Sequence, residues 1–180
     1  MFEGLKRKYI NWQISGFASD KKYRREKKFI NWQDVQDVQI LIALDSPKNG
    51  VMDDILKCMT GKNVSVWCYI SQNNYVRQDS EKVTYLNPKS ISFFAKPNKI
   101  IIGKFIKETP DVLLDLTMEE CFPLKYLAGA SKAHCKCGIC KEDYSLYDLE
   151  IRGDRKMSRM ELLEQIMYYL KTIQSKKIAK

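Results

Sequence analysis

The sequence has only one histidine, His134, among its 180 residues. Proteases of the HExxH type need two histidines on one zinc ion, so they are excluded, as are most other multi-histidine metal sites. Neither of the glycine-rich phosphate motifs, GxGxxG and GxxxxGK[ST], occurs. We therefore expect no tight binding of a dinucleotide or of ATP by the usual phosphate loops.

The sequence also lacks long apolar runs. No window approaches the run of about 20 apolar residues that a membrane span needs, and no signal-peptide segment follows residues 1–8. We therefore expect a cytoplasmic protein. In that compartment the six cysteines are expected to be reduced thiols rather than a disulfide framework.

What the chain does contain is typical of one globular domain, with 44% hydrophobic and 29% charged residues. Its net charge of +9 is concentrated at the two ends. Residues 1–28 carry nine basic and three acidic residues, and residues 152–180 carry eight and three. The remaining body is close to neutral, so the basic character belongs to the termini.

The first 33 residues are predicted to form a basic, amphipathic helical arm. Phe2, Leu5, Tyr9 and Trp12 recur at helical spacing, and a cationic stretch follows. The anion-binding candidates in that stretch are Lys21, Lys22, Arg24, Arg25, Lys27 and Lys28. Cations with interleaved aromatic residues suit nucleic acid, whose phosphates and bases they contact. Two alternatives remain open: contact with an anionic membrane surface, and aromatics packed on the sheet below a solvated charged face.

From residue 34 to residue 180 the pattern predicts a single α/β domain. Short apolar runs alternate with helical patterns, which is typical of βαβ units. We expect a three-layer, Rossmann-like or flavodoxin-like fold with a mainly parallel sheet. The expected strands cover residues 38–44, 64–70, 83–86, 112–116, 133–137 and 146–151. The expected helices begin at Ser46-Pro47, near residue 98, near residue 117 and at the Ser158/Glu161 capping box.

The segment from Pro110 to Leu124, continued to Gly138, resembles a family of bacterial proteins known only as a domain of unknown function. Tyr147-Asp148-Leu149 and the Tyr168-Tyr169-Leu170 helix extend this resemblance. Residues 112–138 are more distantly similar to the N-terminal Rossmann-like half of heptosyltransferase-type glycosyltransferases. That second resemblance implies nucleotide-sugar chemistry. The chain departs from it in lacking the Gly-Asp turn after the first strand and in being too short for the second domain of those enzymes.

Ligands of open parallel sheets bind beyond the carboxyl ends of the strands, so two loops are the expected pocket. The candidates there are Asp45, Ser46, Asn49, Asp115, Thr117, Glu119 and Glu120. The carboxylates would suit a general base or Mg²⁺. The alternative, which we favour, is that Thr117 and Glu120 form a capping box, with Glu119 stabilising the helix dipole.

Four soft metal ligands are concentrated in seven residues: His134, Cys135, Cys137 and Cys140. The Cys137-x-x-Cys140 spacing suits zinc, but no second pair completes a tetrahedral site. We therefore expect the cysteines to pack in the core and no cofactor to bind, with zinc binding or a redox role as the alternative. A catalytic pair between His134 and Cys121, Cys58 or Cys68 is the least favoured hypothesis.

The hypothesis that these features favour is a non-catalytic binding or adaptor protein. Its partner would be anionic, a nucleic acid or a ribonucleoprotein, with peripheral membrane contact as the weaker option. The alternative is a reduced glycosyltransferase-like or nucleotide-binding enzyme with its site at the carboxyl ends of the parallel strands.

Overall fold

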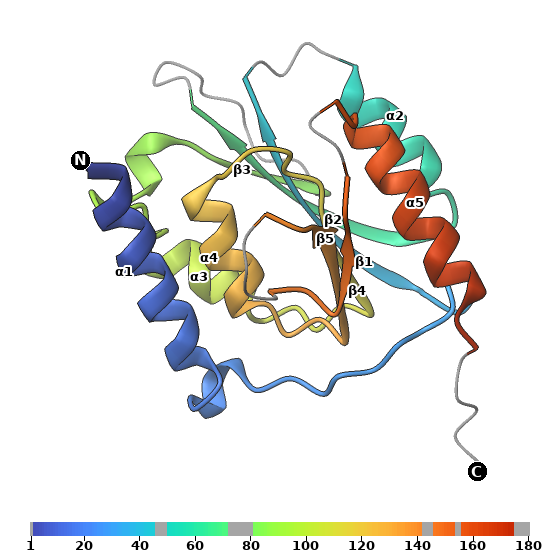
Figure 1. Cartoon of the computed structure of the whole chain (residues 1–180), viewed down its shortest axis with the longest axis horizontal. Coiled ribbons are helices and arrows are strands. Elements are labelled where there is room, and N and C mark those ends of the chain that lie inside the picture. Colours follow the sequence, from blue (N-terminus) through green and yellow to red (C-terminus); the bar gives the residue numbers. More distant parts are fainter. Residues whose placement is uncertain (1, 46–49, 72–80, 142–145, 154–155, 175–180) are drawn as a thin grey trace.

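The structure is a computed structural model that describes residues 2–45, 50–71, 81–141, 146–153 and 156–174. In these residues strands and helices alternate along the chain (Figure 1). The elements are α1 (Phe2–Phe17), η1 (Lys21–Tyr23), β1 (Asp37–Leu44), α2 (Val51–Cys58), β2 (Asn63–Ile70), β3 (Val83–Leu86), η2 (Pro88–Ser90), α3 (Lys99–Phe105), β4 (Val112–Asp115), α4 (Phe122–Ala130), β5 (Cys135–Ile139), β6 (Leu149–Ile151) and α5 (Arg159–Thr172).

The six strands of the described residues form one parallel sheet in the order β3-β2-β1-β4-β5-β6. β4 is buried at every position and β1 at most of its positions, as expected for strands covered on both faces. This is the strand order of a doubly wound sheet, and the order reverses between β1 and β4. The predicted three-layer, Rossmann-like α/β fold is confirmed.

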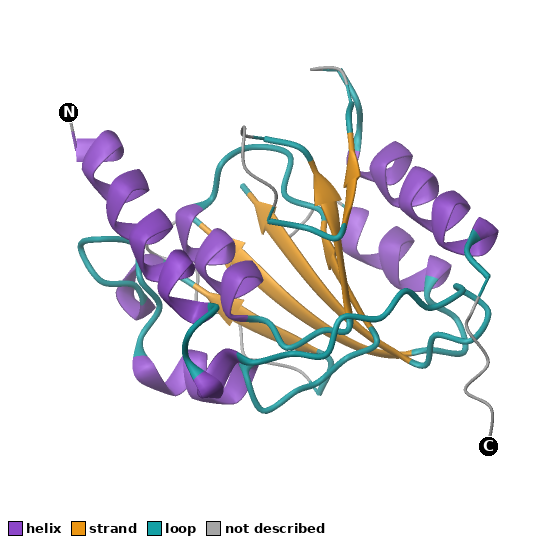
Figure 2. Ribbon diagram, turned by 60° about the horizontal axis from the view of Figure 1, so that its bottom comes forward, coloured by secondary structure: helices purple, strands orange, loops and turns teal. Residues whose placement is uncertain are grey.

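Helices cover both faces of the sheet (Figure 2). α2 and α5 pack on one face through apolar residues such as Ile55, Leu163 and Ile166. On the other face α3 and α4 pack through residues such as Phe105 and Leu127. Since helices return antiparallel to the strands, the N-termini of α2, α4 and α5 lie at the edge where the strands end.

α1 packs against α4, and its buried face is not the predicted stripe. Ile10 is fully buried, and Phe17 lies 5.2 Å from the ring of Tyr126. Ile14 fills the space above Gly129, where an added Cβ would lie 2.7 Å from Ile14 Cγ1. Phe2, Leu5 and Trp12 of the predicted stripe stay exposed.

The basic segment after α1 follows the edge where the strands begin. The Arg25 guanidinium donates to both carboxylate oxygens of Asp148, at 2.6 and 2.8 Å, and to the carbonyl oxygens of Ala133 and His134. Further along, the Trp32 N–H donates to the carbonyl of Leu170 at the end of α5. A basic N-terminal extension separate from the domain is therefore not confirmed, and the boundary at residue 33 stays a prediction.

Most predicted elements form close to their expected limits, and four differ. α4 begins at Phe122 rather than near residue 117. α2 begins at Val51 after Gly50 (φ 64°), whereas the predicted start at Ser46-Pro47 lies outside the described residues. β5 covers Cys135–Ile139 rather than residues 133–137. β6 is limited to Leu149–Ile151. No helix of the described chain is long and apolar enough to cross a membrane; the cytoplasmic location stays a prediction.

Candidate functional site

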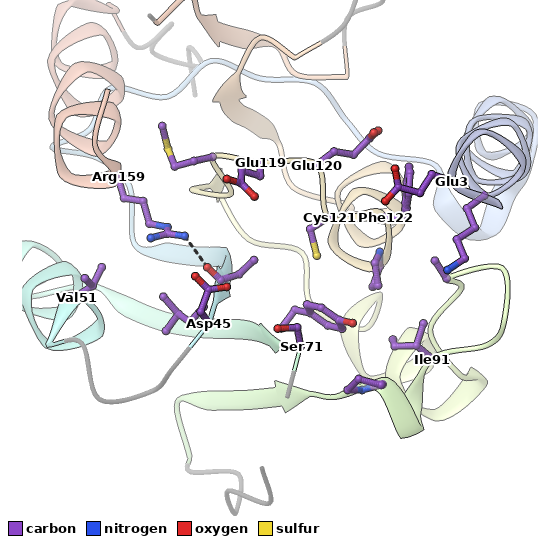
Figure 3. A pocket seen from close by; sticks show the side chains of 18 of the residues that line it. Glu3, Asp45, Val51, Ser71, Ile91, Glu119, Glu120, Cys121, Phe122 and Arg159 are labelled. Atoms are coloured by element: carbon purple, nitrogen blue, oxygen red, sulfur yellow. Dashed lines mark hydrogen bonds between the residues drawn. The ribbon is translucent and has the colours of Figure 1, made fainter. Parts of the chain in front are cut away.

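A wide pocket lies at the carboxyl edge of the sheet, where the strand order reverses. Its volume is about 970 Å³, and it is bounded by the ends of β1 and β2 and the segments before α4 and α5 (Figure 3). Apolar walls come from Tyr69, Met118, Phe122 and Met160. The volume lies within the range of ligand pockets, about 300–1,000 Å³.

Three of the predicted pocket residues meet here: Asp45, Glu119 and Glu120. Asp45 follows β1 directly, while the two glutamates lie between β4 and α4. Glu120 already has cationic partners, since Arg7 and Lys125 both donate to its carboxylate. Of the three predicted acidic residues, Asp45 and Glu119 are thus the better placed for a ligand. Ser46 and Asn49 lie outside the described residues.

Asp115 and Thr117, also predicted, are buried beside the pocket rather than in it. One carboxylate oxygen of Asp115 accepts from the N–H and the hydroxyl of Thr117, and the other accepts from the hydroxyl of Tyr147. Lys141 Nζ donates in turn to the Thr117 hydroxyl, at 2.5 Å. Because both carboxylate oxygens are already bonded, Asp115 is suited to hold the end of β4 in place rather than to act as a base.

The capping box predicted for Thr117 and Glu120 is wrong. α4 begins after Cys121, which caps it without a side-chain hydrogen bond. The hydroxyl of Thr117 instead donates a hydrogen bond to the carboxylate of Asp115. The segment between β4 and α4 is therefore not helical, and its residues 118–121 line the pocket.

Arg159, the first residue of α5, is a pocket residue that the sequence analysis missed. Its Nη2 donates to the carbonyl oxygen of Ala43, at 2.8 Å, so the guanidinium is directed at the end of β1 (Figure 3). Its Nε is buried and has no hydrogen-bond partner among the described residues. A buried donor without an acceptor costs about 1–3 kcal/mol, so the site calls for an acceptor that these residues do not supply.

Cys121 also lines the pocket. Burial, helped by the charge of Asp115, raises the pKa of its thiol to about 12, against the opposing effects of the Leu124 N–H and Lys141. Its thiol therefore stays protonated at neutral pH and is a poor nucleophile. His134 lies near the start of β5, where Nδ1 meets the carbonyl of Glu26, so it is not paired with Cys121.

The cysteines of the predicted soft-ligand cluster lie in or beside β5. Cys135 and Cys137 are buried with their sulfurs 3.7 Å apart, and His134 does not share their face. No group of three or more histidine, cysteine or acidic side chains able to hold a metal occurs in the described part of the chain. None of the six cysteines, all of which are described, forms a disulfide. That the protein binds no cofactor stays a prediction.

The predicted anion-binding cations divide into two sets. Arg25 and Lys27 pair with Asp148, and Arg25 is mostly buried. Lys21, Lys22, Arg24 and Lys28 are exposed. All of them follow the edge where the strands begin, opposite the pocket, so the two candidate binding surfaces are separate.

A protein-family model, Family of unknown function (DUF6913), matches residues 6–173. No curated protein and no solved structure matches the chain.

Proposed function

Since the chain belongs to a family whose function is unknown, we propose a function from its own geometry: the protein binds a small phosphorylated sugar or nucleotide sugar in the pocket at the carboxyl edge of its sheet. The observation that carries this proposal is the buried Nε–H of Arg159, a cationic donor at the pocket wall for which the described residues supply no acceptor. Guanidinium groups bind phosphate and carboxylate oxygens in preference to neutral acceptors.

The position of the pocket supports the same ligand. Doubly wound sheets bind ligands beyond the strand ends where the strand order reverses. The N-terminus of α5, which carries Arg159, and the N-terminus of α4 both lie along this pocket. Backbone N–H groups and the dipole at a helix N-terminus favour an anionic group there.

Two further features favour a sugar over a simple anion. The carboxylates of Asp45 and Glu119 accept hydrogen bonds, as sugar hydroxyls require. Tyr69 and Phe122 supply aromatic walls against which a ring can pack. The distant resemblance of residues 112–138 to heptosyltransferase-type enzymes agrees with this ligand class.

Binding is expected to raise the melting temperature. At a ligand concentration about 100 times Kd the stabilisation is ~2.7 kcal/mol, which is roughly 5–10 °C for a chain of this size. UDP-glucose, UDP, glucose 1-phosphate and inorganic phosphate are suitable probes in a thermal-shift assay. We expect Arg159→Gln to weaken binding of the stabilising probe by about tenfold or more, because a charged hydrogen bond is lost.

The matched control is Arg152→Gln, which removes an exposed arginine outside the pocket and should leave the thermal shift unchanged. Arg159→Lys keeps the charge but lacks the Nε–H, so it should behave like Arg159→Gln. The proposal is wrong if no probe raises the melting temperature of the wild type. It is also wrong if Arg159→Gln, Arg159→Lys and the control Arg152→Gln all show the same thermal shift.

A second candidate function, binding of nucleic acid by the basic segment, is favoured by one observation. Lys21, Lys22, Arg24 and Lys28 remain exposed along an edge of the domain that the pocket does not use. Phosphate contacts of this kind depend steeply on salt. The adaptor role in a ribonucleoprotein belongs to this candidate.

A salt titration of poly(U) RNA binding tests it. Neutralising the four exposed cations to glutamine should lower the slope of log K against log salt by about 3, since each contact to single-stranded nucleic acid contributes about 0.7. The control neutralises four exposed cations elsewhere, Lys82, Arg152, Lys156 and Lys171, and should keep most of the slope. An equal loss of slope in both variants would count against a specific surface.

A further inference from the structure

Six apolar or aromatic side chains that are distant in the sequence form one surface, which we call the aromatic ridge. Four lie on α1 and two on the turn after η2. The members are Phe2, Leu5, Tyr9, Trp12, Phe93 and Phe94. Phe2, Trp12 and Phe93 are about two-thirds exposed, at 64%, 66% and 67%. Large apolar patches on a soluble surface mark sites of interaction.

The rings of the ridge pack on one another, and Tyr9 also packs against the core below. Phe2 meets Phe93 edge to face, with ring centroids 6.1 Å apart, and Phe93 meets Phe94 in the same way at 5.3 Å. Tyr9 completes the set by lying 5.0 Å from Phe94. Through these contacts the side chains of α1 and of the turn form one continuous aromatic ridge.

The turn that carries Phe93 and Phe94 is tightly held. The Ser92 N–H donates to the carbonyl of Lys96, and the Ala95 N–H donates to the carbonyl of Ser92, both at 2.8 Å. Ala95 has a φ of 63°, a left-handed conformation that is unfavourable for a residue with a side chain. Strained backbone is retained where the surrounding structure fixes it, commonly at binding sites. The strained turn here presents two phenylalanines to solvent.

The two segments that carry the ridge are rich in cations. α1 carries Lys6, Arg7 and Lys8 against a single acidic residue, Glu3. The segment 88–107, which includes the turn, carries five lysines and no aspartate or glutamate. One of the α1 lysines, Lys6, has its ammonium 5.9 Å from the centre of the Phe93 ring. The partner of this surface must therefore accept both apolar side chains and positive charge.

We propose that the aromatic ridge docks on the surface of an anionic phospholipid bilayer. Apolar side chains entering the headgroup region next to lysines that meet anionic lipids are the features of interfacial membrane binding. Single-stranded nucleic acid fits less well, because it needs free ring faces for base stacking. The edge-to-face packing covers part of those faces, and the aliphatic Leu5 offers none.

This inference goes beyond the proposed function. The ridge and the pocket are neighbours, since Glu3, Lys6 and Phe93 line one wall of the pocket. The carboxyl edge of the sheet would then lie close to the bilayer. Docking nevertheless needs no ligand, so the two proposals can fail separately.

Vesicle flotation with the full chain tests the docking. We expect binding to vesicles of phosphatidylcholine mixed with phosphatidylglycerol in equal parts, and little binding to phosphatidylcholine alone. A Phe93→Ser, Phe94→Ser double variant should partition at least about tenfold less, because two inserting side chains are lost. Trp32 and Trp67 are buried, so a blue shift of tryptophan emission on binding reports Trp12. Trp12→Phe should abolish that shift and keep most of the binding.

The matched control is the double variant Tyr168→Ser, Tyr169→Ser, which removes two exposed aromatic residues from α5 and should bind vesicles as the wild type does. Arg159→Gln should also bind normally, which separates docking from the pocket. Three outcomes would overturn the proposal: no binding to the anionic vesicles, an equal loss in both double variants, or ridge-dependent binding of poly(U) RNA without vesicle binding.

Discussion

Replacing Arg25 by methionine is expected to lower the free energy of unfolding by about 3–5 kcal/mol. Arg25 holds Asp148 through two hydrogen bonds, and both side chains are largely buried. Although burial raises the pKa of Asp148, the hydrogen bonds from Arg25 and the Lys136 N–H bring it below its usual value. Without Arg25 the carboxylate loses its main buried counter-charge, which is the costly situation for a buried ion.

Urea denaturation measures this effect, with Arg24→Met as the control because Arg24 is an exposed neighbour of the same charge. The control should change stability by less than about 0.5 kcal/mol. Adding Asp148→Asn to the Arg25 variant should recover part of the loss, since the charge is removed while the acceptor for the Lys136 N–H is kept. Equal small effects of both arginine variants would show that residues 24–28 are not part of the folded domain.

The second large effect concerns Lys136, whose ammonium is buried against the end of α4. Its Nζ donates to the carbonyls of Ala128 and Gly129, at 2.7 and 3.0 Å. Burial, with help from the nearby charge of Arg25 and against that of Asp148, lowers the pKa of Lys136 to about 7. An unfolded lysine keeps a pKa of about 10.4.

Between these two pKa values the unfolded chain binds a proton that the folded chain does not, so the contribution of Lys136 to stability rises with pH. From pH 7 to pH 9 the gain is about 2 kcal/mol. The measurement is urea denaturation at several pH values in this window, for the wild type and Lys136→Met. Burial raises the pKa of the Cys121 thiol, which acts in the opposite direction as the pH rises, and the difference between the two pH profiles isolates Lys136. Parallel profiles would contradict the prediction.

The sequence predicts the strands well because buried parallel strands are short, continuous apolar runs. β1 and β4 both show this pattern. The strand order is a different matter. It depends on contacts between residues far apart in the chain, such as the pairing of β1 with β4, and no local pattern encodes these.

α1 shows why periodicity predicts a helix without predicting which of its faces is buried. Its helical period contains two apolar stripes, one with Phe2, Leu5 and Trp12 and one with Ile10, Ile14 and Phe17. Periodicity does not decide which stripe is buried. The choice depends on α4, where Gly129 leaves room for Ile14, and that contact spans more than a hundred residues.

The pocket loops were predictable from the rule that ligands bind at strand ends, but Arg159 was not. At the first position of a capped helix an arginine reads as a surface residue. Its direction toward Ala43 is a property of the fold alone. The burial of Lys136, in contrast, could have been predicted from the sequence. In a strand covered on both faces, a lysine between two cysteines points to the face opposite to theirs, and helices cover that face as well.

The most direct test of the pocket is nuclear magnetic resonance of the Arg159 side chain. In a ¹H–¹⁵N correlation spectrum its Nε–H gives a signal that is assigned by its absence in Arg159→Lys. Titration with UDP-glucose or glucose 1-phosphate is expected to shift this signal in a saturable way, with Arg152 unaffected. Saturable shifts confined to residues 21–28 and the aromatic ridge, with the Arg159 signal unchanged, would contradict the account.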